Sequence, residues 1–135
     1  DVTFNYWMPH RPRKCMFHKK AIVVSTAAGS GAKKAVKDIA DALFYWGIPC
    51  IFTYGISVQA MNWNGISDKR KQKIEKDTTK IANKVLKKKK VKVGLKTKGL
   101  FLVMRMMQKG GMGSGEGERA YWEQNGWLEK ERPWR

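Results

Sequence analysis

At 135 residues the chain is long enough for one domain whose core buries about two-thirds of the unfolded surface. A composition that is 42% hydrophobic, with six Trp, excludes a disordered polar chain. The net charge of +17 indicates attraction to phosphate-bearing partners such as nucleic acid or anionic lipid, and it does not specify the fold.

The first 19 residues are basic and aromatic. Pro9 and Pro12 exclude a long regular helix here, so we expect the end of a helix followed by an extended loop. Aromatic rings that alternate with arginines can stack on bases or on a flat cofactor, and they can equally pin the loop to the core. His10 and His18 stand alone in this loop, and we expect both at the surface.

Residues 20–46 predict a strand, a tight turn and a helix. Residues 21–26 are apolar and β-branched, which is typical of a parallel strand buried on both faces. Small residues follow at 27–31, where backbone N–H groups can lie directly against a ligand. Apolar residues then recur at helical spacing on one face, namely Val36, Ile39, Ala40, Leu43 and Trp46.

A strand that feeds a helix through a glycine turn marks the place where open α/β sheets bind ligands. Residues 29–34 contain neither a complete dinucleotide fingerprint nor a Walker loop. A plain connection, with Ser30 near the helix N-cap, therefore remains an alternative to a cofactor loop.

A second strand is predicted at 50–54, so the unit reads as right-handed, parallel βαβ. Residues 55–65 then form a loop at the ligand end of the sheet, and Ser67 caps a helix that runs to about residue 86. Its apolar face is expected to carry Ile74, Thr78, Ile81 and Val85. Its other faces are rich in lysine, which indicates either a solvated surface or a binding stripe.

The remaining chain combines basic, glycine-rich and tryptophan-rich segments. Lysines continue through residues 87–98, with a short edge strand expected at 91–93. Residues 100–107 predict a short apolar helix that packs on the domain or lies on an anionic membrane. Glycines at 108–117 indicate a mobile linker, and the tail of residues 118–135 is expected to dock its tryptophans onto its own surface or a partner's.

Cys15 and Cys50 suggest no disulfide framework, and no Cys or His set has the spacing of a metal site. Two free thiols are typical of a reducing compartment. The sequence shows neither a membrane-spanning stretch nor a signal peptide, so we expect a cytoplasmic location.

Three stretches together resemble the C-terminal part of the flavodoxin-like NAD(P)H-dependent oxidoreductases, the relatives of FMN reductase. They are residues 20–31, residues 42–47 and the ending Tyr-Trp-x-x-x-Gly-Trp-Leu at 121–128. The resemblance covers nearly the whole chain. It implies an α/β fold with a flavodoxin-like three-layer parallel sheet, of which only the C-terminal half is represented, as strand-helix-strand-helix plus C-terminal helices.

The resemblance also implies an enzyme, an FMN-dependent oxidoreductase that takes electrons from NAD(P)H and passes them to a small-molecule acceptor. The loop after the first strand here would border the flavin ring, which assigns cofactor binding to Thr26, Ala27, Ala28, Gly29, Ser30 and Gly31. Tyr6 and Trp7, in the segment before that strand, are further candidates. No side-chain acid, base or nucleophile is required, because a flavin carries the redox chemistry itself. The family's phosphate loop and second flavin loop have no counterpart here, so the chain is expected to be a truncated form that, alone, binds FMN poorly or not at all and can be inactive.

In this interpretation, residues 1–19 form an aromatic, basic loop leading in from the absent half. Residues 20–90 form a βαβα core, and residues 91–135 supply a basic linker, a short helix, a glycine-rich linker and the tryptophan-rich tail. Unsatisfied sheet edges favour a homodimer. The alternative function is a basic module that binds nucleic acid or an anionic membrane through residues 69–98.

Overall fold

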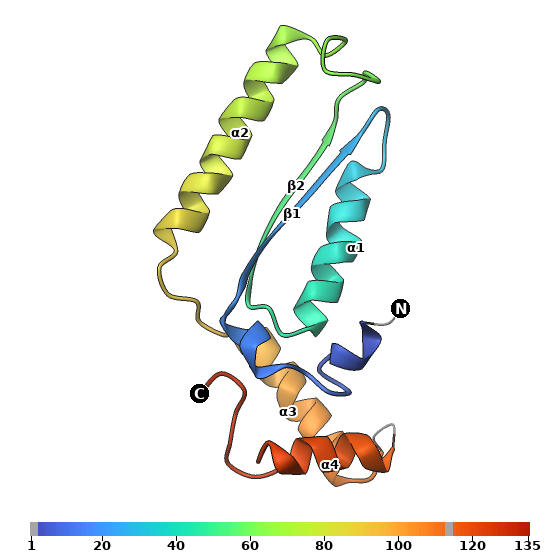
Figure 1. The fold of residues 1–135 in the computed structure, drawn as a ribbon, viewed down its shortest axis with the longest axis vertical. Helices are drawn as coiled ribbons and strands as arrows, with labels where there is room; N and C mark the ends of the chain where they lie inside the picture. Colours follow the sequence, from blue (N-terminus) through green and yellow to red (C-terminus); the bar gives the residue numbers. More distant parts are fainter. Residues whose placement is uncertain (1–2, 113–114) are drawn as a thin grey trace. The chain divides into compact units, whose positions relative to one another are not determined.

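The computed structural model describes residues 3–112 and 115–135, so Asp1, Val2 and two residues of the predicted glycine linker, Gly113 and Ser114, lie outside the described part. Two strands, four α-helices and two short 3₁₀ helices follow one another along the described chain (Figure 1). Their bounds are η1 (Phe4–Tyr6), η2 (Lys14–His18), β1 (Lys20–Ala27), α1 (Ala32–Tyr45), β2 (Cys50–Ser57), α2 (Asp68–Lys87), α3 (Leu95–Lys109) and α4 (Glu116–Gln124).

The fold is mixed α/β and contains one parallel sheet of two strands, β1 and β2, in the described residues. The chain divides into two compact units. The first unit contains the described residues of 1–19, 42–50 and 91–135. The second unit contains residues 20–41 and 51–90, and therefore all of β1 and α2 and most of α1 and β2.

In the second unit α1 and α2 contact opposite faces of the sheet. Contacts made by two successive residues of β2 show this. A Cβ atom on Gly55 would lie 2.8 Å from the carbonyl oxygen of Ala32 in α1, so α1 rests directly on the strand backbone. Tyr54, the residue that precedes Gly55 in β2, interacts electrostatically with Asp77 of α2. Since successive strand residues point to opposite faces, α1 and α2 lie on different sides. Both helices begin at the end of the sheet where the strands finish (Figure 1).

The core of the second unit is small. Its buried apolar side chains are Val23, Ala32, Val36, Ile56 and Ile66. No residue of α2 is fully buried, and Ile74, Ile81 and Val85 are half-buried on the side that faces the sheet. On β1, Ile22 and Val24 remain 49% and 58% exposed. Part of one sheet face is therefore apolar and open.

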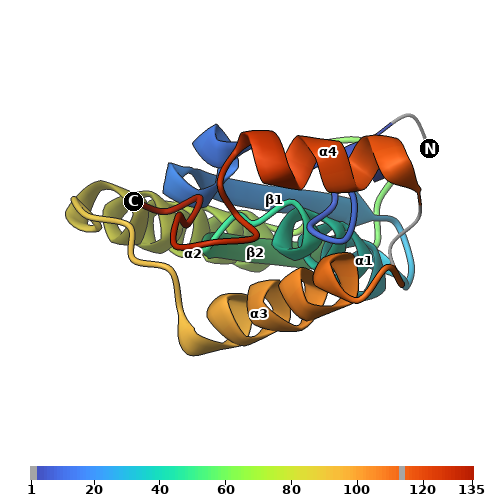
Figure 2. The same cartoon turned by 90° about the horizontal axis from the view of Figure 1, so that it is seen from below.

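The first unit is held together by an aromatic core. The side chains of Met8, Phe17, Phe101, Trp122, Trp127 and Leu128 are buried against one another. The chain after α4 returns towards α3 (Figures 1 and 2), and the ring of Trp134 lies 5.1 Å from that of Phe101. The tail thus docks its tryptophans onto its own unit. The predicted pinning of the N-terminal loop is also found, because Met8 and Phe17 belong to this core.

Several predicted elements need correction. Gly55 belongs to β2 and not to a loop. The strand has a glycine at this position because α1 packs too closely on it for any side chain. Residues 91–93 form no strand, and the first unit uses Val93 to cover its core instead. The helix expected at 100–107 begins at Leu95 and continues to Lys109, into the predicted linker. The N-terminal loop contains two short 3₁₀ helices, η1 and η2.

Smaller corrections concern single residues in the two βα units. Ser67 occupies the N-cap position of α2 without making a side-chain cap hydrogen bond. The residue directly before α1 is Gly31, so Ser30 lies one position too early. Ile39 and Thr78 were expected on apolar helix faces, yet both are exposed. The hydroxyl of Thr78 donates instead to the carbonyl oxygen of Ile74 one turn earlier, at 2.8 Å.

Candidate functional site

A cavity of about 410 Å³ lies at the carboxyl ends of β1 and β2, entirely within the second unit. This volume falls within the range of about 300–1,000 Å³ that is usual for small-molecule sites. The residues that line it come from the end of β1 and from the segment after β2: Thr26, Ala27, Ala28, Val58, Ala60, Met61, Asn62, Trp63 and Ile66. Ligands of open α/β sheets bind at this edge.

Backbone hydrogen bonds tie the two sides of the cavity together beyond the strands. The N–H group of Val58 donates to the carbonyl oxygen of Ala27, and that of Gln59 donates to Ala28, both at 2.8 Å. Gln59 adopts a positive φ of 55°, which turns the chain away from the sheet. The cavity floor is therefore a continuation of the sheet pairing.

Arg70, in the first turns of α2, fastens the end of β2. Its guanidinium donates to the carbonyl oxygen of Ser57, and Nη2 lies 3.4 Å from Oε1 of Gln59. A planar guanidinium suits this task because it presents several donors in a fixed geometry. The same group places a positive charge beside the cavity.

The segment after β2 forms the outer wall. Asn62 Oδ1 accepts a hydrogen bond of 2.9 Å from the N–H group of Gly65, and this contact closes a tight turn. Ile66 is buried, whereas the indole of Trp63 is 57% exposed and has Lys71 Nζ 5.7 Å from its ring centroid. The wall thus offers a flat aromatic surface with an adjacent cation.

Residues 29–31 join β1 to α1 and are the most open part of the site. A Cβ atom on Gly29 or Gly31 would meet no atom within 4 Å, and Gly31 has a φ of +98° that favours glycine. In the described part of the chain no hydrogen bond uses the backbone N–H groups of residues 29–31. These groups adjoin the N-terminus of α1, where the helix dipole and Lys33 favour a negative ligand.

The structure brings some of the predicted site residues together and separates others. Thr26, Ala27 and Ala28 line the cavity, and residues 29–31 follow them directly without being part of its lining. Trp63 and Met61 were not selected from the sequence, although their loop was expected at this edge. To select these two residues from the sequence, one would have to know the residue at which β2 ends. That position determines which residues of the following loop lie beside Ala28.

Tyr6 and Trp7 belong to the first unit and make their contacts there. The guanidinium carbon of Arg13 lies 4.8 Å from the Tyr6 ring centroid. The Trp7 ring stacks on that of Tyr45, with centroids 4.9 Å apart and planes within 8°. Neither residue is among those that line the cavity described above.

His10 is not the surface group expected from the sequence. Its Nδ1 lies 2.8 Å from Oε1 of Glu118, and only 13% of its side chain is exposed. The carbonyl oxygen of the same residue accepts a hydrogen bond of 2.7 Å from Trp122 Nε1. His10 therefore joins the N-terminal loop to α4 and has a structural role.

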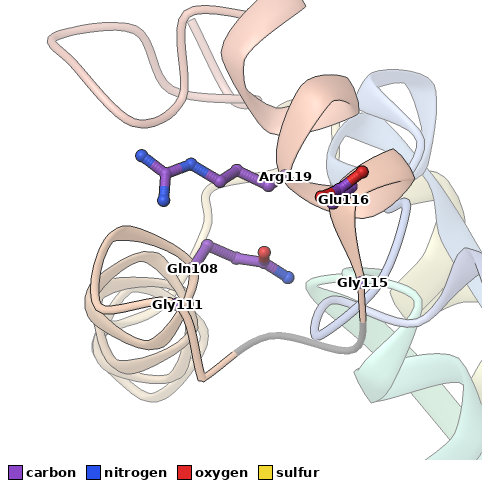
Figure 3. A pocket seen from close by; sticks show the side chains of 5 residues that line it. All are labelled: Gln108, Gly111, Gly115, Glu116 and Arg119. Carbon is purple, nitrogen blue, oxygen red and sulfur yellow. The ribbon is translucent and has the colours of Figure 1, made fainter.

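The first unit has a smaller cavity of about 250 Å³ beside α3 and α4, lined by Gln108, Gly111, Gly115, Glu116 and Arg119 (Figure 3). Two of its polar side chains, Gln108 and Arg119, are engaged with groups that do not line it. Gln108 Nε2 donates to the carbonyl oxygen of Pro9 at 2.9 Å, and Arg119 Nε lies 3.0 Å from Oε1 of Glu123. This cavity is the weaker candidate for a ligand site.

Among residues 3–112 and 115–135 no group of three or more His, Cys, Asp or Glu side chains is placed to hold a metal ion. Within those same residues, no helix combines the length and the apolar character that crossing a bilayer requires. No model of a known family, no curated protein and no solved structure matches this chain.

Proposed function

We propose that the cavity at the ends of β1 and β2 binds the ring system of FMN, and that the chain takes part in NAD(P)H-dependent flavin reduction. One observation carries the proposal. The three residues Thr26, Ala27 and Ala28, which the family resemblance assigns to flavin binding, line a cavity of suitable size at the expected edge of the sheet.

The chemistry of the lining fits a flat, electron-accepting ring. Ala27 and Ala28 carry side chains small enough for a ring to approach the backbone, and the exposed indole of Trp63 offers a stacking surface. The unused N–H groups of residues 29–31 suit the negative edge of a reduced flavin or a phosphate group. Lys33 and Arg70 add positive charge.

When bound, FMN would supply the redox chemistry by accepting a hydride from NAD(P)H and passing electrons to a small-molecule acceptor. The residues of this chain bind and orient the ring and set the charge around it. In the described residues β1 and β2 each pair on one edge only, and these unpaired strand edges favour completion of the sheet in a homodimer.

Titration of the full chain with FMN, followed by quenching of flavin fluorescence, tests the proposal. We expect saturable binding of FMN. The variant Ala28→Trp should weaken this binding at least about tenfold, or about 1.4 kcal/mol. Ala28 is exposed and lines the cavity, so the larger side chain would fill the space that the ring needs. The matched control is Ala82→Trp on an exposed position of α2 away from the cavity, and this variant should bind as the parent does.

A folded parent chain that leaves flavin fluorescence unchanged would contradict the proposal, as would equal loss in both variants. If FMN binds, oxidation of NADPH should follow at 340 nm only when flavin is present. Flavin binding without NADPH oxidation would limit the chain to a flavin carrier.

A further inference from the structure

Six lysines of α2 lie along one side of the helix. They are Lys69, Lys73, Lys76, Lys80, Lys84 and Lys87, and all six are exposed. Their spacing of three or four residues places them within a sector of about 80° on a helix of 3.6 residues per turn. At about 1.5 Å per residue the row is about 27 Å long.

Five of the six lysines have no acidic partner in the described part of the chain. Lys73 alone is paired, with its Nζ 2.9 Å from Oδ2 of Asp77. The acidic residues Asp68 and Glu75 project from other sides of the helix, as the same spacing shows. Lys88, Lys89 and Lys90, which follow α2 directly, are exposed as well. Except at Lys73, the row is therefore a line of uncompensated positive charge.

From this geometry we infer that the lysine row of α2 binds the phosphate backbone of a nucleic-acid duplex without preference for base sequence. A row about 27 Å long spans about eight base pairs along the axis of a duplex, whose two strands together carry one phosphate charge per about 1.7 Å of axis. Lysine ammonium groups act as point charges for phosphate and carry little base-reading geometry. Neutralised phosphates release counterions, and this release drives the association.

Two other occupants fit the row less well. Single-stranded nucleic acid needs aromatic platforms for its bases, and α2 contains no aromatic residue. An interfacial membrane helix needs an exposed apolar side, whereas Ile74, Ile81 and Val85 are half-buried towards the sheet. The inference does not depend on flavin binding, because the row and the cavity use different residues.

Fluorescence anisotropy with a labelled 20-base-pair DNA duplex tests the inference on the full chain over a range of NaCl concentrations. We expect log affinity to fall with log salt with a slope of about −4.5 if five lysines each neutralise one phosphate. Changing all six lysines to Gln should abolish most of this slope and lower affinity at least about tenfold at low salt. Gln has nearly the helix propensity of Lys, so circular dichroism should show α2 retained.

The matched control removes the same number of charges elsewhere, by changing Lys14, Lys19, Lys37, Lys92, Lys98 and Lys130, all exposed, to Gln. This control should bind the duplex with an affinity within about threefold of the parent's. The same is expected of a variant in which all six lysines of the row are changed to Arg. Equal loss in the row variant and the control would show that only the net charge of +17 attracts DNA, and would overturn the inference.

Two further probes complete the test. A single strand of the same length should bind more weakly than the duplex, and tighter binding of the single strand would contradict the proposed geometry. Vesicles of phosphatidylserine and phosphatidylcholine should not co-sediment the chain through this row. If the parent chain bound these vesicles but not the duplex, and the Lys→Gln variant of the row did not bind the vesicles, the row would be assigned to membranes instead.

Discussion

Gly55 of β2 lies so close to Ala32 of α1 that a Cβ atom on Gly55 would be 2.8 Å from the Ala32 carbonyl oxygen and 2.9 Å from its carbonyl carbon. The obstacle is backbone and cannot rotate away. The contact fixes the first turn of α1 against the strand that carries one side of the candidate site. Gly55 therefore sets the distance between the helix N-terminus and the sheet.

The first prediction concerns this contact. Gly55→Ala should lower the free energy of unfolding by about 1–3 kcal/mol, because the extra methyl group overpacks the interface. Gly29→Ala is the matched control, since a Cβ atom there meets nothing within 4 Å. Urea denaturation followed by circular dichroism measures both. Equal stability of the two variants would mean that α1 is free to move away from β2.

A second prediction concerns Tyr54, whose hydroxyl is buried without a hydrogen-bond partner in the described part of the chain. Burial, and then the nearby carboxylate of Asp77, raise its pKa above the ordinary value of 10.0. The folded chain therefore holds this proton longer than the unfolded chain. The resulting stabilisation is complete below pH 10.0 and is lost as the pH rises through the raised pKa.

Tyr54→Phe should remove this alkaline loss and cost little stability near neutral pH, because no hydrogen bond is broken. The measurement is urea denaturation of both proteins at about pH 8 and above pH 10.0. Titrating lysines that do not interact with Tyr54, which are all but Lys73, affect both proteins alike and cancel in the difference. An identical alkaline decline in the two proteins would show that Tyr54 does not contribute.

The third prediction tests the aromatic core of the first unit. Trp122 is fully buried, with its ring 4.9 Å from that of Phe101 and its Nε1 bonded to the His10 carbonyl oxygen. Trp122→Ala should cost about 3–5 kcal/mol of unfolding free energy. Trp63→Ala, at an exposed position, should change the free energy of unfolding by less than about 0.5 kcal/mol. Similar losses at both sites would contradict this assignment of the core.

Arg70 supports a fourth prediction, on the floor of the candidate site. Arg70→Met keeps much of the aliphatic stem and loses the hydrogen bond to the Ser57 carbonyl oxygen, so it should cost about 1–2 kcal/mol of unfolding free energy. FMN affinity should fall as well, because the end of β2 is released. Lys69→Met, on an exposed neighbour, is the control and should leave both quantities unchanged.

The order and type of the main elements could be predicted from the sequence because their signals are local. An apolar β-branched run predicted β1, and residues at helical spacing predicted α1 and α2. Gly55 was misread because glycine usually ends a strand, while here it serves a contact with a helix distant in sequence. The start of α3 was missed because its first turns expose Leu95 and contain Gly99, which obscures the helical pattern.

The candidate site was predictable only on one side. Residues 26–28 follow directly from the end of β1, whereas Trp63 reaches the cavity through a turn that the Asn62–Gly65 hydrogen bond creates. The contact between His10 and Glu118 joins residues 108 positions apart, and no local pattern indicates it. Contacts of this kind depend on tertiary packing and cannot be read from spacing.

The open apolar side chains of β1 have a practical consequence for handling the purified chain. Ile22 and Val24 lie along a strand that has no partner on its outer edge in the described residues, and such strands tend to pair with one another. The net charge of +17 opposes such pairing between molecules, and salt screens that repulsion. High ionic strength, which is commonly used to strip nucleic acid from basic proteins, would therefore promote precipitation of this one.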